Sequence, residues 1–335
     1  MQGLRGIREG RLDDLPPLAV LMGPNGCGKS SVLEALLLGA SNDVGEAVGR
    51  CVQRRMEVPF GSSLLFTNRG DPPNRVARVE LSGDSSNDAQ TVQLRWSQGA
   101  ADGSKGDEWV AHITGAVGPS IPPRRTSTQF TSHNAYQVVK VDDRIAQSPF
   151  GYVRFLDQRI GVPRSPLHKV YSDALNRGAL AKVRDLARQL LPAMQDIQIL
   201  TPNEQTPVLH IIYGDGAVPV ALSGDGIESA VRLALEMAAR SKGVFLIEEP
   251  EAHQHIAAMA RSARVICAAV RQGAQVVLST HSLEFLDLLI DEAGEGDLDK
   301  LGAYQLRLDD GELRSTRVAG QDVRFARSTI AQDLR

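Results

Sequence analysis

A glycine-rich segment that begins at Gly23, GPNGCGKS, has residue types and a spacing that suit phosphate binding. It fits the pattern G-x-x-x-x-G-K-[ST] between the apolar run LAVLM and the helix-forming run SSVLEALLLGA. Gly26 and Gly28 let the backbone curl so that its N–H groups face phosphate oxygens, and Lys29 reaches the β- and γ-phosphates. Ser30 offers a hydroxyl to Mg²⁺. The residues expected to bind ATP are Gly23, Pro24, Asn25, Gly26, Cys27, Gly28, Lys29, Ser30 and Ser31.

Three carboxylates follow the apolar run GVFLI in the stretch GVFLIEEPEAHQHI. Metal and nucleophile lie on different sides of a transferred phosphate, so a hydrolase needs a group for each. We expect Glu248 to act at Mg²⁺ and Glu249 to polarise the attacking water. In the alternative interpretation, Glu248, Glu249 and Glu251 only begin a solvated helix, where acids are favourable. The position after a strand, downstream of the phosphate loop, favours the catalytic interpretation.

One histidine has a suitable position for sensing the phosphate. His281, in VVLSTHSLEFL, follows another apolar run, so its imidazole is expected to contact the γ-phosphate and to take part in catalysis with Glu249 and Lys29. His253 and His255 form an HxH pair, but no third ligand has a suitable spacing. We therefore interpret this pair as local structure at a helix start.

The elements that must position these groups alternate along the second half of the chain. Apolar runs at 243–247 and 275–280 alternate with helical patterns at 226–241, 252–272 and 282–293. Strands alternating with helices predict a mostly parallel central sheet with helices on both faces. The expected fold class is therefore α/β, of the P-loop NTPase type.

A different pattern occupies the middle of the chain. RVARVEL and TVQLRW alternate apolar and polar residues, and EWVAHITGAV and YQVVKVDDRI are further strand candidates, so an antiparallel β subdomain is expected. Residues 118–135 are rich in Pro, Ser and Thr and predict a mobile loop. The chain is interpreted as a single domain, 1–335, with a phosphate-binding lobe (1–41), a β-rich insertion (42–150) and a lobe carrying the carboxylates (151–335).

The composition is that of an ordinary globular protein. The chain has 335 residues, 42% hydrophobic and 23% charged. Its net charge of −3 indicates no general affinity for nucleic acid, although it does not exclude a local basic patch. The aromatic content of 4% argues against a surface on which bases stack. The three cysteines form no CxxC, which suggests a reducing compartment. With no secretory signal and no apolar run near the ~20 residues that span a bilayer, a cytoplasmic protein without a membrane partner is expected.

Residues 222–229 read LSGDGIES, which is close to the LSGGQ signature of ABC-type ATPases; they are called the signature below. In the same order as in that class, the chain also contains "LMGPNGCGKSSVLEAL", "LIEEPEAHQHI" and "LSTHSLEFL". It resembles the RecF/SMC-like side of the ABC ATPases. Within that group it is most similar to the ATPase heads of the OLD (overcoming lysogenization defect) family and related bacterial AAA-type ATPases. The likeness covers most of the chain and is weak in 42–150.

This resemblance implies that two heads sandwich ATP between the P-loop of one and the signature of the other. It assigns Ser223 and Gly224 to the γ-phosphate of a partner's nucleotide, with the helix that begins near Gly226 directing its N-terminus at that phosphate. A serine, a glycine and a helix N-terminus are physically suited to an anion. The resemblance thus implies a homodimer or a higher oligomer.

Some parts of the family pattern are changed or not found. The usual Walker B aspartate is Glu248 here, one methylene longer, which would alter the metal geometry or slow turnover. Gln53 and Gln158 are both candidates for the Q-loop glutamine. For stacking on the adenine, Arg5 and Arg8 are the candidates upstream of the P-loop.

Four functions remain open. The leading hypothesis is an ATP-hydrolysing switch that dimerises around ATP and controls a separately encoded effector, a nuclease or toxin in bacterial anti-phage defence. The 54 residues after His281 are too few for the TOPRIM nuclease that OLD proteins commonly carry, and Asp297 and Asp299 read as a loop. The alternatives are a RecF-like DNA-repair ATPase that clamps DNA, a transporter nucleotide-binding subunit and a non-hydrolysing scaffold. Arg124, Arg125 and the Arg-rich 50–55 segment are candidates for a DNA-binding groove.

Overall fold

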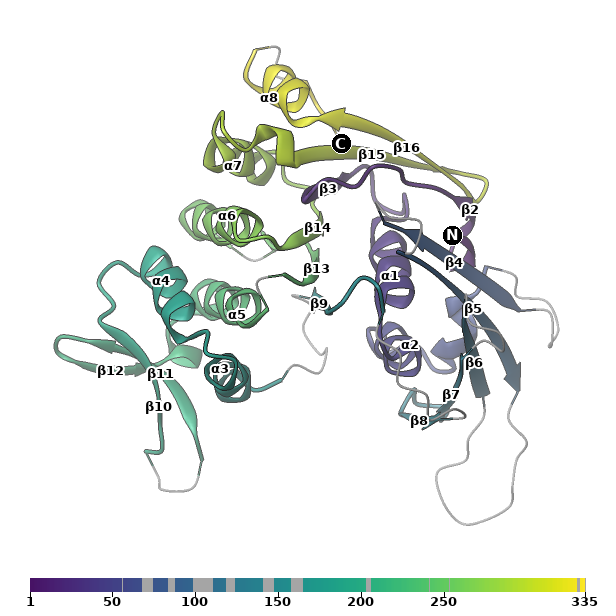
Figure 1. Ribbon diagram of the computed structural model, residues 1–335, viewed down its shortest axis with the longest axis horizontal. Coiled ribbons are helices and arrows are strands. Elements are labelled where there is room, and N and C mark those ends of the chain that lie inside the picture. The colour runs from purple at the N-terminus through teal and green to yellow at the C-terminus, as the bar shows by residue number, and fades with distance from the viewer. Residues whose placement is uncertain are drawn as a thin grey trace. The chain divides into compact units, whose positions relative to one another are not determined.

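Figure 1 shows the computed structural model of the chain, which divides into two compact units. The structure describes residues 1–55, 57–67, 75–83, 88–98, 111–118, 124–140, 148–157, 165–202, 206–240, 242–252, 254–329 and 332–334. Unit 1 consists of Met1–Asp13, Gly23–Arg154 and Leu306–Thr316. Unit 2 consists of Asp14–Met22, Phe155–Gln305 and Arg317–Arg335. Each unit is thus assembled from segments that are distant in the sequence.

Unit 1 is built on an antiparallel sheet. Its strands, in spatial order, are β8 (Tyr136–Lys140), β7 (Arg124–Phe130), β6 (Ala111–Gly118), β5 (Ala89–Gln98), β4 (Val76–Ser82), β1 (Gln2–Leu4) and β2 (Ile7–Gly10). The start of β16 (Glu312–Ala319) pairs parallel to β2. The unit also contains α1 (Lys29–Ala40), α2 (Val44–Gln53) and the 3₁₀ turn η1 (Gly61–Leu65). Helix α1 packs on β4 and β5, and α2 packs on β6, β7 and β8.

Two elements of unit 1 differ from the expectation. Residues 118–135, for which the sequence predicts a loop, contain β7, which pairs antiparallel with β6 and β8. Serine and threonine suit a strand when their side chains pack or form hydrogen bonds, and the buried Thr128 hydroxyl donates to the Gly45 carbonyl at 3.1 Å. Helix α2 is unforeseen, although Asp43 caps it by accepting from the Glu46 N–H at 3.1 Å.

The sheet of unit 2 has the strand order β15 (Leu301–Asp309), β3 (Leu18–Met22), β14 (Gln275–Ser279), β13 (Val244–Glu248) and β9 (Val153–Asp157). The pairs β15·β3, β3·β14 and β14·β13 are all parallel. Every residue of β3 is buried, as expected of a strand covered on both faces. The α/β fold class predicted from the sequence, with helices packed on a large mixed sheet, is confirmed.

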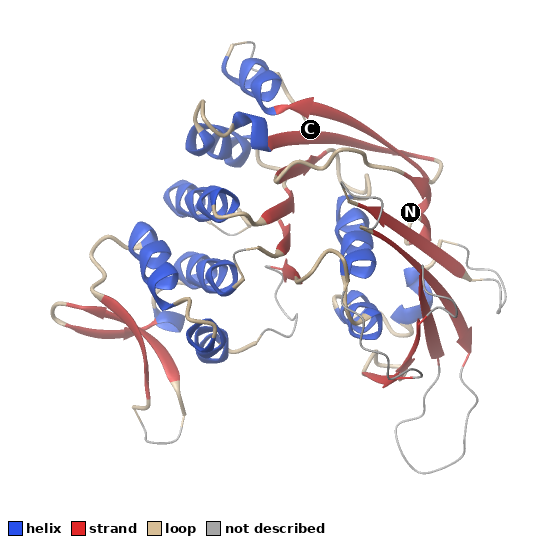
Figure 2. Ribbon diagram, in the orientation of Figure 1, coloured by secondary structure: helices blue, strands red, loops and turns tan. Residues whose placement is uncertain are grey.

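The helices of unit 2 are α3 (Leu167–Asn176), α4 (Leu180–Leu190), α5 (Asp225–Ala239), α6 (Ile256–Arg271), α7 (Leu283–Ala293) and α8 (Gly320–Ser328), with the 3₁₀ turns η2 (Val220–Leu222) and η3 (Leu298–Lys300). Helices α5, α6 and α7 lie beside the sheet of unit 2, whereas α3 and α4 pack on α5 (Figure 2). A small antiparallel sheet contains β10 (Asp196–Leu200), β11 (Val208–Tyr213) and β12 (Gly216–Pro219). Within the described ranges, no helix is both long enough and apolar enough to span a bilayer.

Candidate functional site

The P-loop, residues 23–30, belongs to unit 1 and leads into the first turn of α1. Gly23 has φ +140°, and a Cβ there would lie 2.5 Å from the Leu306 carbonyl oxygen and 2.8 Å from Cys27 Sγ. Gly28 is the N-cap of α1 with φ +96°, and no side chain caps this helix. Both positions therefore require glycine. The loop ends at the N-terminus of α1, where the free N–H groups and the helix dipole favour an anion.

Lys29 holds the P-loop together in this structure. Its side chain is buried, and Nζ donates to the Gly23 carbonyl at 2.7 Å and to the Pro24 carbonyl at 3.1 Å. Pro24, Asn25 and Gly26 are exposed, so the outer side of the loop is accessible to solvent. Because Lys29 donates to carbonyls, an arriving phosphate has to compete for the ammonium group, which has three donors.

The carboxyl ends of three parallel strands meet at one edge of unit 2. Glu248, the last residue of β13, pairs in register with Ser279 of β14, and Ser279 pairs in register with Leu21 of β3. Glu248 is only 2% exposed. The edge of an open parallel sheet at its carboxyl ends is where ligands bind in this class of fold.

Glu249 and His281 come together at this edge. The Glu249 Oε1 atom lies 3.4 Å from His281 Nε2, and both side chains are partly exposed, at 43% and 35% respectively. Glu249 has φ +46°, a conformation that is strained for a residue with a Cβ, and its N–H donates to the Ser279 carbonyl at 3.0 Å. Strain of this kind is concentrated at functional sites.

A third carboxylate, Glu251, is bonded into the same edge. Its Oε1 accepts from the Thr280 hydroxyl at 2.6 Å and from the His281 N–H at 3.1 Å. Burial raises the pKa of Glu251, although these hydrogen bonds oppose the rise. From the sequence no role of its own is expected for Glu251. The feature that could have indicated one is the motif EEPE, whose last glutamate stands where transporters have serine or threonine.

The interpretation of these glutamates as a solvated helix start is wrong. Helix α6 begins only at Ile256, whereas the sequence predicted a start at residue 252. Glu248 instead ends β13, and Glu249 and Glu251 lie in the turn after it, in which the Ala252 N–H donates to the Glu249 carbonyl at 2.9 Å. His255 caps α6 by accepting from the Ala257 N–H at 3.3 Å, as expected of local structure, and His253 lies outside the described residues.

The signature forms a turn into α5. Ser223 is half-buried, its hydroxyl donates to the Pro219 carbonyl at 3.2 Å, and Gly224 is the N-cap of α5 with φ +90°. No side chain caps α5, which begins at Asp225, one residue before the expected start. This N-terminus has the dipole that favours an anion, whereas the carboxylate of Asp225 opposes one.

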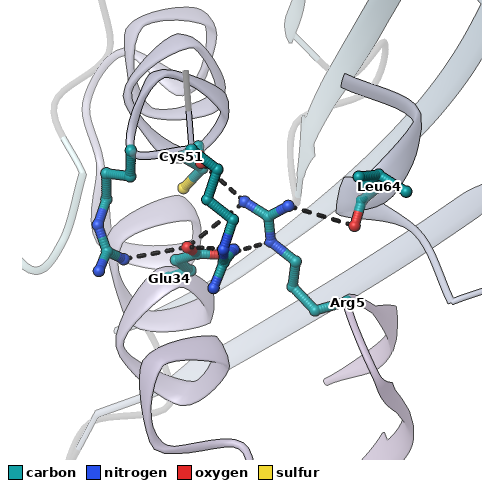
Figure 3. A network of polar contacts seen from close by, with 6 residues as sticks. Arg5, Glu34, Cys51 and Leu64 are labelled. Atoms are coloured by element: carbon teal, nitrogen blue, oxygen red, sulfur yellow. Dashed lines mark hydrogen bonds and ion pairs between the residues drawn. The ribbon is translucent and has the colours of Figure 1, made fainter. Parts of the chain in front are cut away.

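Arg5 does not serve the adenine base. Figure 3 shows its guanidinium inside a network of polar contacts: Nε donates to Glu34 Oε2 at 2.7 Å, Nη2 to the Cys51 carbonyl at 2.7 Å and Nη1 to the Leu64 carbonyl at 3.2 Å. The Arg5 side chain is 7% exposed. The expectation that Arg5 stacks on adenine is therefore wrong, because its donors are engaged in the interior of unit 1.

The same network involves the Arg-rich segment 50–55. Arg54 Nη1 and Arg55 Nη1 lie 3.0 Å and 3.2 Å from Glu34 Oε1. Burial alone would raise the pKa of Glu34, but Arg5, Arg54 and Arg55 outweigh it and hold that pKa below its usual range. Arg54 and Arg55 are thus bound to Glu34, whereas Arg50 is exposed, and the DNA-binding role of this segment stays a prediction.

The two Q-loop candidates stay predictions. Gln53 is the last residue of α2 and is half-buried, and Gln158 lies outside the described residues. Arg8, the other adenine candidate, forms an exposed ion pair with Asp310 at 3.5 Å. Its stacking on adenine also stays a prediction.

Comparison with protein families assigns the chain. A family model described as "AAA domain, putative AbiEii toxin, Type IV TA system" matches residues 94–287, which is more than half of the chain. The chain belongs to this family. A second model, described as "AAA domain", matches residues 1–116. By family this is therefore an AAA-type ATPase domain.

The chain is also similar to individual proteins. "Uncharacterized protein MJECL11" of Methanocaldococcus jannaschii is 33% identical over 114 residues, which cover 33% of this chain and 98% of the relative. A crystal structure of an SmcHead bound to the C-winged helix domain of ScpA is 14% identical and has a TM-score of 0.50, with 95% of this chain and 96% of that chain covered. The Smc head domain from Pyrococcus furiosus, 13% identical, has a TM-score of 0.49 over 99% and 98% of the chains. At such identities the likeness to the first head concerns the fold alone.

Proposed function

We propose that this AAA domain binds ATP with Mg²⁺ and hydrolyses it, and that its nucleotide state switches a separately encoded effector. The observation that carries this proposal is the pair formed by Glu249 and His281, 3.4 Å apart, where parallel strands end. A partly exposed carboxylate beside an imidazole suits the activation of water and the sensing of a phosphate. The P-loop supplies the motif for the phosphates.

The roles of the residues follow from their chemistry. Lys29 and the N–H groups at the start of α1 would bind the β- and γ-phosphates, and Glu249 would accept the proton of the attacking water. Ser30 and Glu248 each carry an oxygen donor of the kind that Mg²⁺ prefers, so each suits this ion by its chemistry. When bound, Mg²⁺ would neutralise phosphate charge and orient the phosphates.

Hydrolysis is tested with Glu249→Gln. The variant keeps the size of the side chain but cannot accept a proton, so ATP turnover should fall by about 10²–10⁴-fold, the usual contribution of a general base. ATP binding should be retained, because Glu249 is not expected to bind the nucleotide. Glu284→Gln, an exposed glutamate at the start of α7, is the matched control and should hydrolyse ATP normally. Equal turnover by wild type and Glu249→Gln would refute the role of Glu249.

Control of an effector is supported by the resemblance to OLD-type heads and by the uncapped N-terminus of α5 at Ser223 and Gly224. In this proposal the signature binds the γ-phosphate of a partner's ATP, so the ATP-bound form is a dimer or a higher oligomer. Glu249→Gln, tagged and isolated from its native cells in Mg-ATP, should retain this form. Recovery of a nuclease or toxin in a fixed ratio supports the anti-phage switch, whereas duplex DNA without such a protein supports the RecF-like alternative.

A further inference from the structure

Glu251 has no part in the proposed chemistry, yet it is mostly buried, next to Glu249 and His281, which do take part in it. Its Oε1 accepts two hydrogen bonds, and its Oε2 is buried without a hydrogen-bond partner among the described residues. A buried carboxylate that lacks a nearby cation is unfavourable unless hydrogen bonds stabilise it. Simple solvation therefore does not explain a glutamate at this position.

The two bonds to Oε1 connect the ends of neighbouring strands. Glu251 lies in the turn after β13, whereas Thr280 and His281 follow β14. Thr280 is fully buried, its N–H donates to the Leu21 carbonyl of β3 at 3.1 Å, and its hydroxyl also accepts from the Ser282 N–H at 3.0 Å. One carboxylate oxygen thus attaches the turn after β13 to a segment that is itself anchored to the sheet.

The same turn fixes the backbone of Glu249. The Glu249 N–H donates to the Ser279 carbonyl, and the Glu249 carbonyl accepts from the Ala252 N–H. A non-glycine residue at φ +46° is strained and persists only where its surroundings hold it. The bonds of Glu251 are the side-chain part of that restraint, and one of them reaches the backbone of His281 directly.

We infer that Glu251 is a positioning residue that holds the Glu249 carboxylate and the His281 imidazole at their mutual distance; this inference rests on the proposed hydrolysis. The 2.6 Å bond from the Thr280 hydroxyl is the shorter of the two, and it holds the turn to a residue that is fully buried. Loss of both bonds would release the turn after β13. Displacement of a catalytic group by about 1 Å reduces turnover by about 10²-fold.

The test uses Glu251→Ala, Glu251→Gln and the control Glu284→Ala in the full chain. Glu251→Ala should lower kcat by about 10²-fold with little change in KM, because ATP binding does not involve the turn. Glu251→Gln keeps an oxygen that accepts from Thr280 and His281, so it should restore most of kcat. Glu284→Ala should behave as wild type. A normal kcat for Glu251→Ala, or no rescue by Glu251→Gln, would overturn the inference.

A second readout does not depend on activity. In Glu251→Ala the NMR signals of the His281 imidazole should shift, because the Glu249 carboxylate, 3.4 Å away in wild type, is no longer held beside the ring. In Glu251→Gln, which keeps an acceptor for Thr280 and His281, these signals should stay close to those of wild type. Identical imidazole signals in wild type and Glu251→Ala contradict the positioning role. A wild type without ATPase activity whose imidazole signals shift in Glu251→Ala would reject the proposed hydrolysis and retain the positioning.

Discussion

The buried network around Glu34 makes a strong prediction for stability. Glu34 is fully buried and is the common acceptor of Arg5, Arg54 and Arg55, whose side chains are 7%, 3% and 32% exposed. Glu34→Gln would leave two thoroughly buried guanidinium groups without an anion. Removal of one partner of a buried ion pair costs about 3–5 kcal/mol, whereas an exposed pair contributes about 0–1 kcal/mol.

The expected loss is large compared with the total stability of a domain, about 5–15 kcal/mol. For a unit of this size each kcal/mol corresponds to roughly 2–4 °C, so the melting temperature of unit 1 should fall by about 6–20 °C. Urea unfolding at neutral pH measures the free energy. The matched control is Glu80→Gln, which removes an exposed carboxylate paired with Arg78 and should change the free energy by less than about 0.5 kcal/mol.

The contribution of Glu34 to the free energy of unfolding should also depend on pH. The pKa of Glu34 is lowered in the folded state, so its contribution is fully present above the pKa of the unfolded chain. That contribution is lost as the pH falls through the lower, folded-state pKa. The difference between wild type and Glu34→Gln should therefore be constant near neutrality and shrink in acid. A loss below about 1 kcal/mol, the value of an exposed pair, would refute the assignment of this network as a buried anchor.

Three further predictions concern the P-loop, the signature and the cysteines. Lys29→Ala removes charged hydrogen bonds to ATP worth about 1.5–3 kcal/mol. The Kd for ATP, measured by calorimetry, should therefore rise roughly 10- to 100-fold, and an unchanged Kd contradicts the P-loop assignment. Ser223→Arg, combined with Glu249→Gln, should abolish the ATP-dependent dimer in light scattering while ATP still binds; a persisting dimer argues against the signature's role. Burial raises the pKa of Cys51 and of Cys267 to about 12. At pH 8 the thiolate fraction of each cysteine is then only about 10⁻⁴, so iodoacetamide should modify them only after unfolding.

The sequence was informative where a feature depends on nearby residues. The P-loop between β3 and α1, and the glutamates after β13, follow from local patterns in which an apolar run ends in a motif. Helix α5 also begins within one residue of its expected start. Such features depend on backbone preferences within a few residues, which a single sequence contains.

Features that depend on distant partners were not foreseen. The hydroxyl-rich residues of β7 read as a loop because polarity indicates exposure, whereas their pairing with β6 and β8 decides the structure. Arg5 was considered for adenine because it lies upstream of the P-loop, but Glu34 and the Cys51 carbonyl engage it. Glu251 likewise acquires its partners only when β13 and β14 lie side by side.

Unit 2 is assembled from segments that are far apart in the sequence, and this affects its folding during synthesis. Strand β3 is central in this unit, yet its neighbours β14 and β15 are at the far end of the chain, and Gln275 bonds the Leu15 carbonyl across 260 residues. At about 5–20 residues per second, the apolar β3 waits for its partners for roughly 13–50 seconds after it is made. The parallel sheet can therefore close only after β14 and β15 have been made, and until then the apolar β3 is without its strand partners.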